Sequence, residues 1–285
     1  MMDVGGAPAG ARGMERRLGL SDAVVIGLGS MVGAGIFAAL GPAADAAGSG
    51  LLLALGLASV VAYCNATSSA RLAALYPESG GTYVYGRERL GEFWGYLAGW
   101  AFVVGKTASC AAMALTVGAY LWPGQAHAVA VAAVVALTAV NYAGVQKSVL
   151  LTRIVVCTVL AVLAAVVVAA LGSADADAAR LGIGPDVTVG GVLQAAGLLF
   201  FAFAGYARIA TLGEEVRDPA RTIPRAIPVA LAITLAVYAL VAVAVLAVLG
   251  PHGLAAATAP LSDAARAARR PGARPRPGCR STSAG

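Results

Sequence analysis

Two apolar stretches decide the fold: GLGSMVGAGIFAALGP, residues 27–42, and GLLFFAFAGYARIATLGEE, residues 197–215. Each carries glycine near its middle, at Gly33 and Gly35 in the first and at Gly205 in the second. Glycine inside a helix costs about 1 kcal/mol relative to alanine. At membrane depth it indicates either close helix packing or a point where the helix unwinds. The recurrence of this pattern in two spans favours a pair of broken helices.

The composition surrounding these stretches is that of a membrane protein. Of 285 residues, 59% are hydrophobic and 12% are charged, whereas soluble domains are about a quarter charged. An apolar run of about 20 residues crosses the hydrocarbon core as a helix. The sequence therefore predicts an all-α, polytopic helical membrane protein with about seven spans. They are Leu20–Ala44, Gly50–Leu72, Phe93–Leu121, Ala126–Tyr142, Leu150–Leu171, Gly190–Leu212 and Ile223–Leu249.

The basic residues of the short loops predict the orientation of these spans. Cytoplasmic loops of membrane proteins are enriched in lysine and arginine. Counted up to the seventh span, the side of the N-terminus carries 11 such residues and the other side carries only Arg180. The 11 are Arg12, Arg16, Arg17, Arg71, Arg87, Arg89, Lys147, Arg153, Arg217, Arg221 and Arg225. We expect an integral plasma (inner) membrane protein with a cytoplasmic N-terminal tail, residues 1–19, and a transmembrane domain, residues 20–249.

The end of the chain departs from this pattern. Residues 250–285 hold six arginines, although the seventh span should end outside, and Ala267–Gly285 reads AARRPGARPRPGCRSTSAG. Such a Pro/Arg-rich, aperiodic segment predicts disorder over 250–285. A solvated basic tail or an out-of-frame end would both produce it. Because much of the net charge of +6 comes from this tail, the charge gives no reason to expect a nucleic-acid partner.

Broken helices expose backbone groups that can hold a substrate. The start of a half-helix offers free N–H groups, which suit a carboxylate, and the end of one offers free C=O groups, which suit an ammonium. The two glycine-bearing spans are the first and the sixth, so their breaks could face one substrate between them.

Three motifs together resemble the amino acid–polyamine–organocation (APC) superfamily of amino acid permeases. They are GLGSMVGAGIF (27–37), PESGGTYVYGRERLGEFWGYLAGW (77–100) and FFAFAGYARIATLGEEVRDPARTIPRAIP (200–228), and the resemblance covers about residues 15–260. It implies a five-plus-five inverted-repeat fold, of which this chain resembles the first part and lacks spans eight to ten. A C-terminally truncated permease fragment, or one half of a split permease, is therefore the main alternative to a working transporter.

The resemblance also implies a substrate site between the broken first and sixth spans. The unwound turn of the first span would comprise Ser30, Met31, Val32, Gly33, Ala34, Gly35 and Ile36, with N–H groups near residues 33–35 holding the α-carboxylate. Carbonyls near Met31, Val32, Phe201 and Ala204 would hold the α-ammonium. Phe203 or Tyr206 would cap the substrate, and Ala202, Ala204 and Gly205 would shape its side-chain pocket.

Four charged residues are candidates for proton coupling or gating. Lys106 falls within the third span, where an unpaired charge costs at least about 3 kcal/mol, and it could carry a proton or pair in a water-filled cavity. Arg208 follows the sixth-span break and could pair with Glu214 or Glu215 in an inner gate, or simply face the cytoplasmic vestibule.

The sequence thus predicts a secondary transporter, a proton symporter or an exchanger, rather than an enzyme. No acidic residue is placed at the breaks to bind a cationic side chain, which favours neutral amino acids. We expect no cofactor and no metal, because His127 and His252 lie far apart at span ends. A seven-span receptor or retinal protein is a remote alternative, because the seventh span lacks a lysine for a Schiff base.

Overall fold

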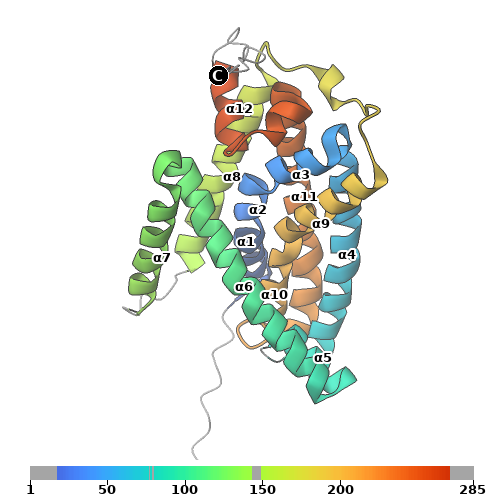
Figure 1. Cartoon of the computed structure of the whole chain (residues 1–285). Helices are drawn as coiled ribbons and strands as arrows, with labels where there is room; N and C mark the ends of the chain where they lie inside the picture. Colours follow the sequence, from blue (N-terminus) through green and yellow to red (C-terminus); the bar gives the residue numbers. More distant parts are fainter. Residues whose placement is uncertain (1–17, 77, 79, 143–148, 270–285) are drawn as a thin grey trace, which may run out of the picture.

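The computed structural model describes residues 18–76, 78, 80–142 and 149–269. The described chain is a bundle of helices (Figure 1). The α-helices are α1 (Leu20–Met31), α2 (Ala34–Ala38), α3 (Leu40–Ala47), α4 (Leu51–Leu75), α5 (Thr82–Leu90), α6 (Glu92–Leu121), α7 (Ala126–Tyr142), α8 (Val149–Leu171), α9 (Val189–Phe203), α10 (Ala207–Ala210), α11 (Pro219–Ala255) and α12 (Pro260–Arg269). Short 3₁₀ turns are η1 (Gly48–Gly50), η2 (Pro123–Gln125), η3 (Ala178–Leu181) and η4 (Ala204–Tyr206).

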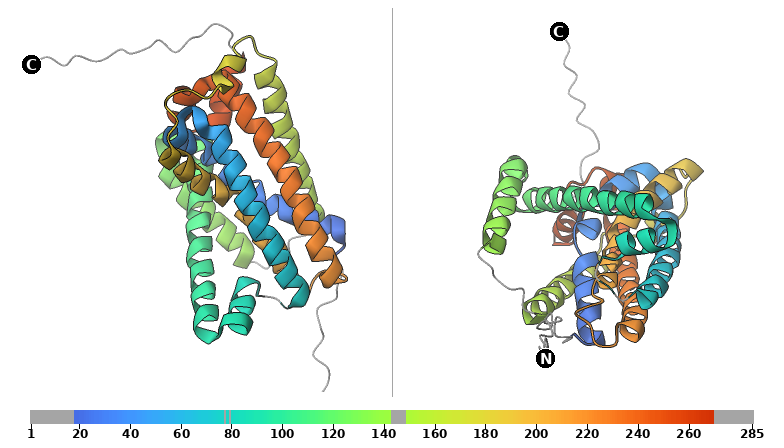
Figure 2. Two further views of the ribbon diagram at one scale, coloured as in Figure 1. Left: turned by 90° about the vertical axis from the view of Figure 1, so that its right-hand side faces the viewer. Right: turned by 90° about the horizontal axis from the view of Figure 1, so that it is seen from below.

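The described residues contain seven helical stretches long and apolar enough to cross a membrane. This confirms the predicted all-α polytopic class. The core of the bundle is formed by α1, α4, α9 and α11, and Figures 1 and 2 show α6 and α7 on its outside. In Figure 1, α5 lies at one end of the bundle and α12 at the other. We call these the α5 side and the α12 side.

The first span breaks after α1, as its glycines predict. Val32 has ψ 85° and Gly33 has φ −153° and ψ −145°, outside the helical region, and α2 then begins at Ala34. The break is shorter than the predicted turn of residues 30–36. Ser30 and Met31 still belong to α1, and Ile36 already donates its N–H to the Gly33 carbonyl, 3.2 Å away.

The sixth span tightens rather than unwinds. Helix α9 ends at Phe203, the 3₁₀ turn η4 covers Ala204–Tyr206, and α10 continues for only four residues. A 3₁₀ turn keeps short-range hydrogen bonds while changing the helical pitch. Where the sequence predicted an unwound break, the sixth span therefore shows a change of helix type around Gly205.

The seventh span begins earlier than the apolar run suggests. Pro219 occupies the first turn of α11, a position that proline tolerates because its missing N–H would have no helical partner. Pro224 and Pro228 lie inside α11. At the far end the backbone leaves the helix at Gly250, whose φ is +68°.

The predicted disorder from residue 250 is wrong for residues up to 269. Helix α11 continues to Ala255 beyond Gly250, and α12 follows with Leu261 and Ala264 buried against the bundle. Pro260 and Asp263 lie in the first turn of α12, where proline and an acidic side chain both favour a helix start. Burial of Leu261 and Ala264 stabilises α12 in spite of its arginines. The proposed out-of-frame end, residues 270–285, lies outside the described residues.

On the α12 side, the loop before α9 is fastened to the turn before α4. The Asp186 carboxylate accepts the Ser49 N–H at 2.9 Å and the Ser49 hydroxyl at 2.7 Å. The Ser49 hydroxyl in turn accepts the Gly184 N–H at 2.8 Å. These bonds, led by the Ser49 backbone N–H, lower the pKa of Asp186 below its ordinary value of 3.8.

We expect this fastening to make the chain sensitive to acid. A carboxyl with a lowered pKa stabilises the fold above its ordinary value and loses that contribution as the pH falls through the folded value. The apparent melting temperature of the purified chain should therefore drop below about pH 4. Asp186→Asn should lower the melting temperature at pH 7 and remove most of its further fall below pH 4. Asp175→Asn, in the same loop, should keep the fall below pH 4 seen in wild type. An equal fall in melting temperature below pH 4 in wild type and Asp186→Asn would contradict a role of Asp186 in this acid sensitivity.

Candidate functional site

The two interrupted spans touch each other at two points. A Cβ added at Gly205 would lie 2.3 Å from the Ser30 carbonyl oxygen and 2.6 Å from the Met31 nitrogen. A Cβ added at Gly35 would lie 2.4 Å from the Cα of Ala202. Glycine is thus required at both positions because backbone packs directly on backbone, as in other close helix contacts in membranes. Residues 30–36 and 202–205, predicted to meet, do meet.

A tyrosine of the seventh span joins the same two segments. The Tyr238 hydroxyl donates to the Met31 carbonyl at 2.6 Å and to the Ala202 carbonyl at 3.0 Å. Its ring packs on Phe203 with centroids 5.1 Å apart. No sequence pattern singles out Tyr238, because a lone tyrosine in an apolar run belongs to no motif.

Several carbonyls predicted to hold an ammonium already accept a hydrogen bond. Met31 accepts from Tyr238, Phe201 accepts the Ala204 N–H, and Ala204 accepts the Ala207 N–H. A carbonyl oxygen has two lone pairs, so each retains one position for a further donor. At the predicted carboxylate site, Ala34 and Gly35 occupy the first turn of α2, where N–H groups have no intrahelical partner.

The two aromatic candidates for capping the substrate differ in position. Phe203 is 0% exposed and is held against Tyr238, so in this structure it cannot cap a substrate. Tyr206 is 5% exposed and lines a cavity. Phe201, by contrast, is exposed on the outside of the span. Of the three aromatic residues, Tyr206 is therefore the one placed to meet a ligand.

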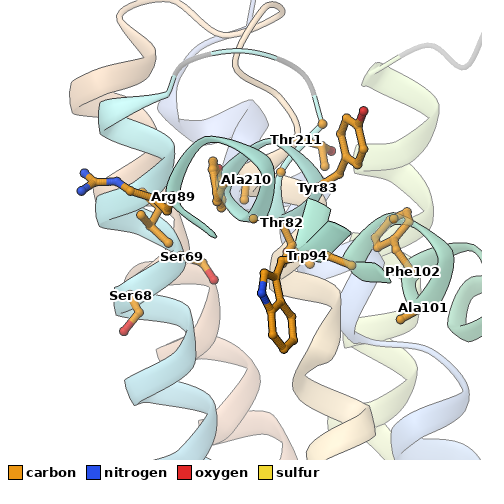
Figure 3. A pocket seen from close by; sticks show the side chains of 18 of the residues that line it. Ser68, Ser69, Thr82, Tyr83, Arg89, Trp94, Ala101, Phe102, Ala210 and Thr211 are labelled. Carbon is orange, nitrogen blue, oxygen red and sulfur yellow. The ribbon is translucent and has the colours of Figure 1, made fainter. Parts of the chain in front are cut away.

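The cavity that Tyr206 reaches opens on the α5 side and has a volume of about 900 Å³. It lies between α4, α5, α6 and α10 (Figure 3). Its polar lining includes Asn65, Ser68, Ser69, Arg89, Tyr206 and Thr211. Gly80 and Gly81 contribute to its wall with φ of +140° and +54°, conformations that glycine adopts without strain. Residues 80–83, 85 and 86 therefore form one wall of a cavity that reaches the sixth span.

Lys106 is not among the described residues that line this cavity. It is exposed on α6, and its Nζ lies 5.7 Å from the centre of the Phe102 ring, one turn earlier. A cation over an aromatic ring is a modest attraction of about 0.5–1 kcal/mol at exposed positions. A role for Lys106 in proton coupling stays a prediction.

The charged loop after the sixth span is tied to the chain that precedes the first. Leu18 donates its N–H to the Glu215 carbonyl at 3.1 Å and accepts the Arg217 N–H at 2.9 Å. Arg208 donates to Thr211 at 3.3 Å. Its pairing with Glu214 or Glu215 stays a prediction. The backbone ties nevertheless connect the start of α1 with the end of the sixth span on the α5 side.

An ion pair holds the start of α1 on its other flank. The Arg153 guanidinium of α8 lies 2.7 Å from the Asp22 carboxylate, which also accepts the Gly19 N–H at 3.1 Å. Both side chains are partly exposed, and such pairs contribute at most about 1 kcal/mol. With the Leu18 bonds, this pair fixes the outer end of α1, while Tyr238 fixes its inner end.

A helical membrane domain whose first and sixth spans are interrupted and touch at the interruptions is typical of many secondary transporters. The comparison with protein families agrees with this class. The family described as amino acid permease matches residues 22–265, and the chain belongs to that family. The match includes residues 250–265, which the sequence placed outside the permease domain.

Three relatives illustrate the family. The chain is 81% identical over 255 residues to an uncharacterised transporter of Mycobacterium tuberculosis, covering 90% of this chain and 58% of the relative. It is 27% identical to a branched-chain amino acid permease of Bacillus subtilis, covering 80% and 54%. It is also 27% identical to a cationic amino acid transporter of Arabidopsis thaliana, covering 88% and 48%. The chain thus spans about half to three fifths of these relatives' lengths.

Proposed function

We propose that this chain forms the substrate-holding part of a secondary amino acid transporter of the plasma membrane, with its N-terminus in the cytoplasm. The observation that carries the proposal is the contact of the two interrupted spans, Gly35 on Ala202 and Gly205 on Ser30. The first-turn N–H groups of α2 would hold the α-carboxylate, and the second lone pairs of the Met31 and Val32 carbonyls would meet the α-ammonium. Proton symport or exchange would drive the movement.

The side-chain pocket supports a neutral substrate. Residues 30–36 and 201–206 contain no aspartate or glutamate, so nothing in the two breaks balances a cationic side chain, which is costly in low dielectric. The Bacillus relative is named for branched-chain substrates and the Arabidopsis relative for cationic ones. The absence of a carboxylate favours the first of these classes for this chain.

The cavity on the α5 side supports a route to the cytoplasm. Its lining includes Tyr206, one residue beyond the contact of Gly205 with Ser30. The loops on this side carry the excess of basic residues, which is the cytoplasmic signature. A substrate released past Tyr206 would therefore enter an aqueous vestibule lined by α4, α5 and α6.

Transport by purified chain in proteoliposomes tests the proposal. We expect saturable uptake of labelled leucine or serine that excess neutral amino acid abolishes and excess lysine does not. Gly35→Val should abolish it, because the added side chain would meet the backbone of Ala202. Gly56→Val is the matched control, because Gly56 lies in α4 with no other atom within 4 Å of an added Cβ.

The outcome also separates the alternatives. Uptake that lysine blocks as well as leucine would contradict the neutral preference. Absence of both binding and uptake in folded chain would favour a fragment that needs further spans, as would transport appearing only with a second polypeptide. Stimulation by an inward proton gradient would distinguish symport from exchange, which instead needs amino acid inside the vesicle.

A further inference from the structure

We infer that Tyr238 is a positioning residue that sets the spacing of the two interrupted spans, an inference that rests on the proposed function for its consequence in transport. The residue lies on α11, is 1% exposed, and contributes no motif to the sequence. Its hydroxyl reaches the Met31 carbonyl on one side and the Ala202 carbonyl on the other.

The two carbonyls need an outside donor. Met31 is the last residue of α1 and Ala202 is the penultimate residue of α9. The last four C=O groups of a helix have no intrahelical partner, and lipid provides none at this depth. Both residues are also buried, with exposures of 2% and 4%. Tyr238 supplies this donor from a third helix.

The same hydroxyl relieves an unfavourable meeting of helix ends. Helices α1 and α9 both direct their C-termini, which carry partial negative charge, toward the middle of the bundle. One O–H hydrogen between two carbonyl oxygens is attracted to both. Because a single O–H can serve two acceptors only when they are close together, the bond holds only while the two spans stay in contact.

The ring of Tyr238 explains why this hydroxyl is held in place. It packs on Phe203, which is fully buried one residue beyond Ala202. The packing restricts the tyrosine rotamer, so the hydroxyl position is fixed by α9 itself. Phe203, expected to cap the substrate, instead supports the residue that joins the two breaks.

The distance between the two interrupted spans decides whether a substrate ammonium can donate to backbone carbonyls of both spans at once. Tyr238 occupies one lone pair on Met31 and leaves the other for the substrate. Without the hydroxyl the two helix ends are free to separate, and each amino acid bound must bring them together again. The expected signature is weaker binding with an unchanged rate of the saturated cycle.

The test compares Tyr238→Phe with Thr234→Val in the full chain. Tyr238→Phe removes only the hydroxyl and keeps the ring on Phe203. Thr234 is a matched control, because it is 0% exposed, lies one turn earlier on α11, and donates to Ala230 within its own helix at 2.8 Å. Hydrogen exchange is measured by mass spectrometry on peptides covering residues 31–37 and 202–208, with α4 as an internal reference.

We expect exchange in both peptides to rise about tenfold in Tyr238→Phe, with α4 unchanged, because one net hydrogen bond is worth roughly that factor. Thr234→Val should leave both peptides as in wild type. In uptake, Tyr238→Phe should raise KM about tenfold with the maximal rate within twofold. Equal exchange in the two variants would overturn the inference, whether or not the chain transports.

Two further outcomes are decisive. If Tyr238→Phe speeds hydrogen exchange in these two peptides but wild-type chain takes up no amino acid, the positioning role is supported and the proposed function is rejected. If Tyr238→Phe does not fold, Tyr238→His restores a ring N–H donor. A folded Tyr238→His chain with near wild-type exchange would support the role, and its failure to fold beside a folded Thr234→Val chain would contradict a role limited to positioning.

Discussion

Gly205→Ala should be strongly destabilising, with an expected loss of about 3 kcal/mol or of folded protein altogether. The added Cβ would lie 2.3–2.6 Å from three backbone atoms of Ser30 and Met31. Backbone cannot move aside as a flexible side chain can, so α1 and the sixth span would have to separate. That separation would also lengthen the two bonds made by Tyr238.

Gly197→Ala provides the control for this prediction. Gly197 lies in the same helix, α9, and nothing lies within 4 Å of an added Cβ. Alanine is the better helix former by about 1 kcal/mol, so this variant should match or exceed wild type. The measurement is the yield of monodisperse protein and its apparent melting temperature in detergent. Similar behaviour of the two variants would refute the close contact at Gly205.

Arg180→Met should give the second largest loss, about 2 kcal/mol. The Arg180 guanidinium, on the α12 side, donates to the carbonyls of Asp175, Ala247 and Val248. The last two belong to α11 just before its backbone leaves the helix at Gly250, so the cation satisfies carbonyls at a helix end and opposes its partial negative charge. The Arg180 Cδ also lies 3.5 Å from where a Gly250 Cβ would be.

The control for this change is Arg225→Met, an exposed arginine at the other end of α11. It removes the same charge from the same helix without the three carbonyl contacts. We expect Arg180→Met to lower the apparent melting temperature and to speed amide exchange in residues 245–256, while Arg225→Met changes neither. Unchanged exchange in this peptide of Arg180→Met would contradict the capping role.

The spans and the first break could be predicted from the sequence because their signals are local. A run of about 20 apolar residues is a membrane helix whatever surrounds it, and clustered glycines at Gly33 and Gly35 mark a weak point in one. The start of the seventh span was less clear from the sequence, because α11 begins at Pro219, before the apolar run, and has Pro224 and Pro228 inside it. The prediction of disorder over residues 250–285 rested on the arginine and proline content. Helix α12 forms nevertheless, because Leu261 and Ala264 are buried against the bundle.

The arrangement of the site depended on contacts between distant residues, which no local pattern reveals. The contacts between the first and sixth spans fall within the predicted residues 30–36 and 201–206, whereas the binding roles of these residues stay a prediction. Phe203 supports Tyr238 instead of facing a substrate, and the Phe201 and Ala204 carbonyls serve the turn η4. Tyr238 could have been suspected only from the rule that a buried hydroxyl needs an acceptor, which does not say which acceptor.

The bond between Tyr238 and Met31 also bears on how the protein is made. The two residues are 207 positions apart, which corresponds to about 10–40 s of synthesis at typical elongation rates. The backbone at Ser30 and Met31 lacks the packing of Gly205 until the sixth span emerges, and the Met31 carbonyl lacks the Tyr238 donor until the seventh span emerges. The interrupted shape of the first span is therefore completed by the last spans described, and the nascent first span must enter the membrane without it.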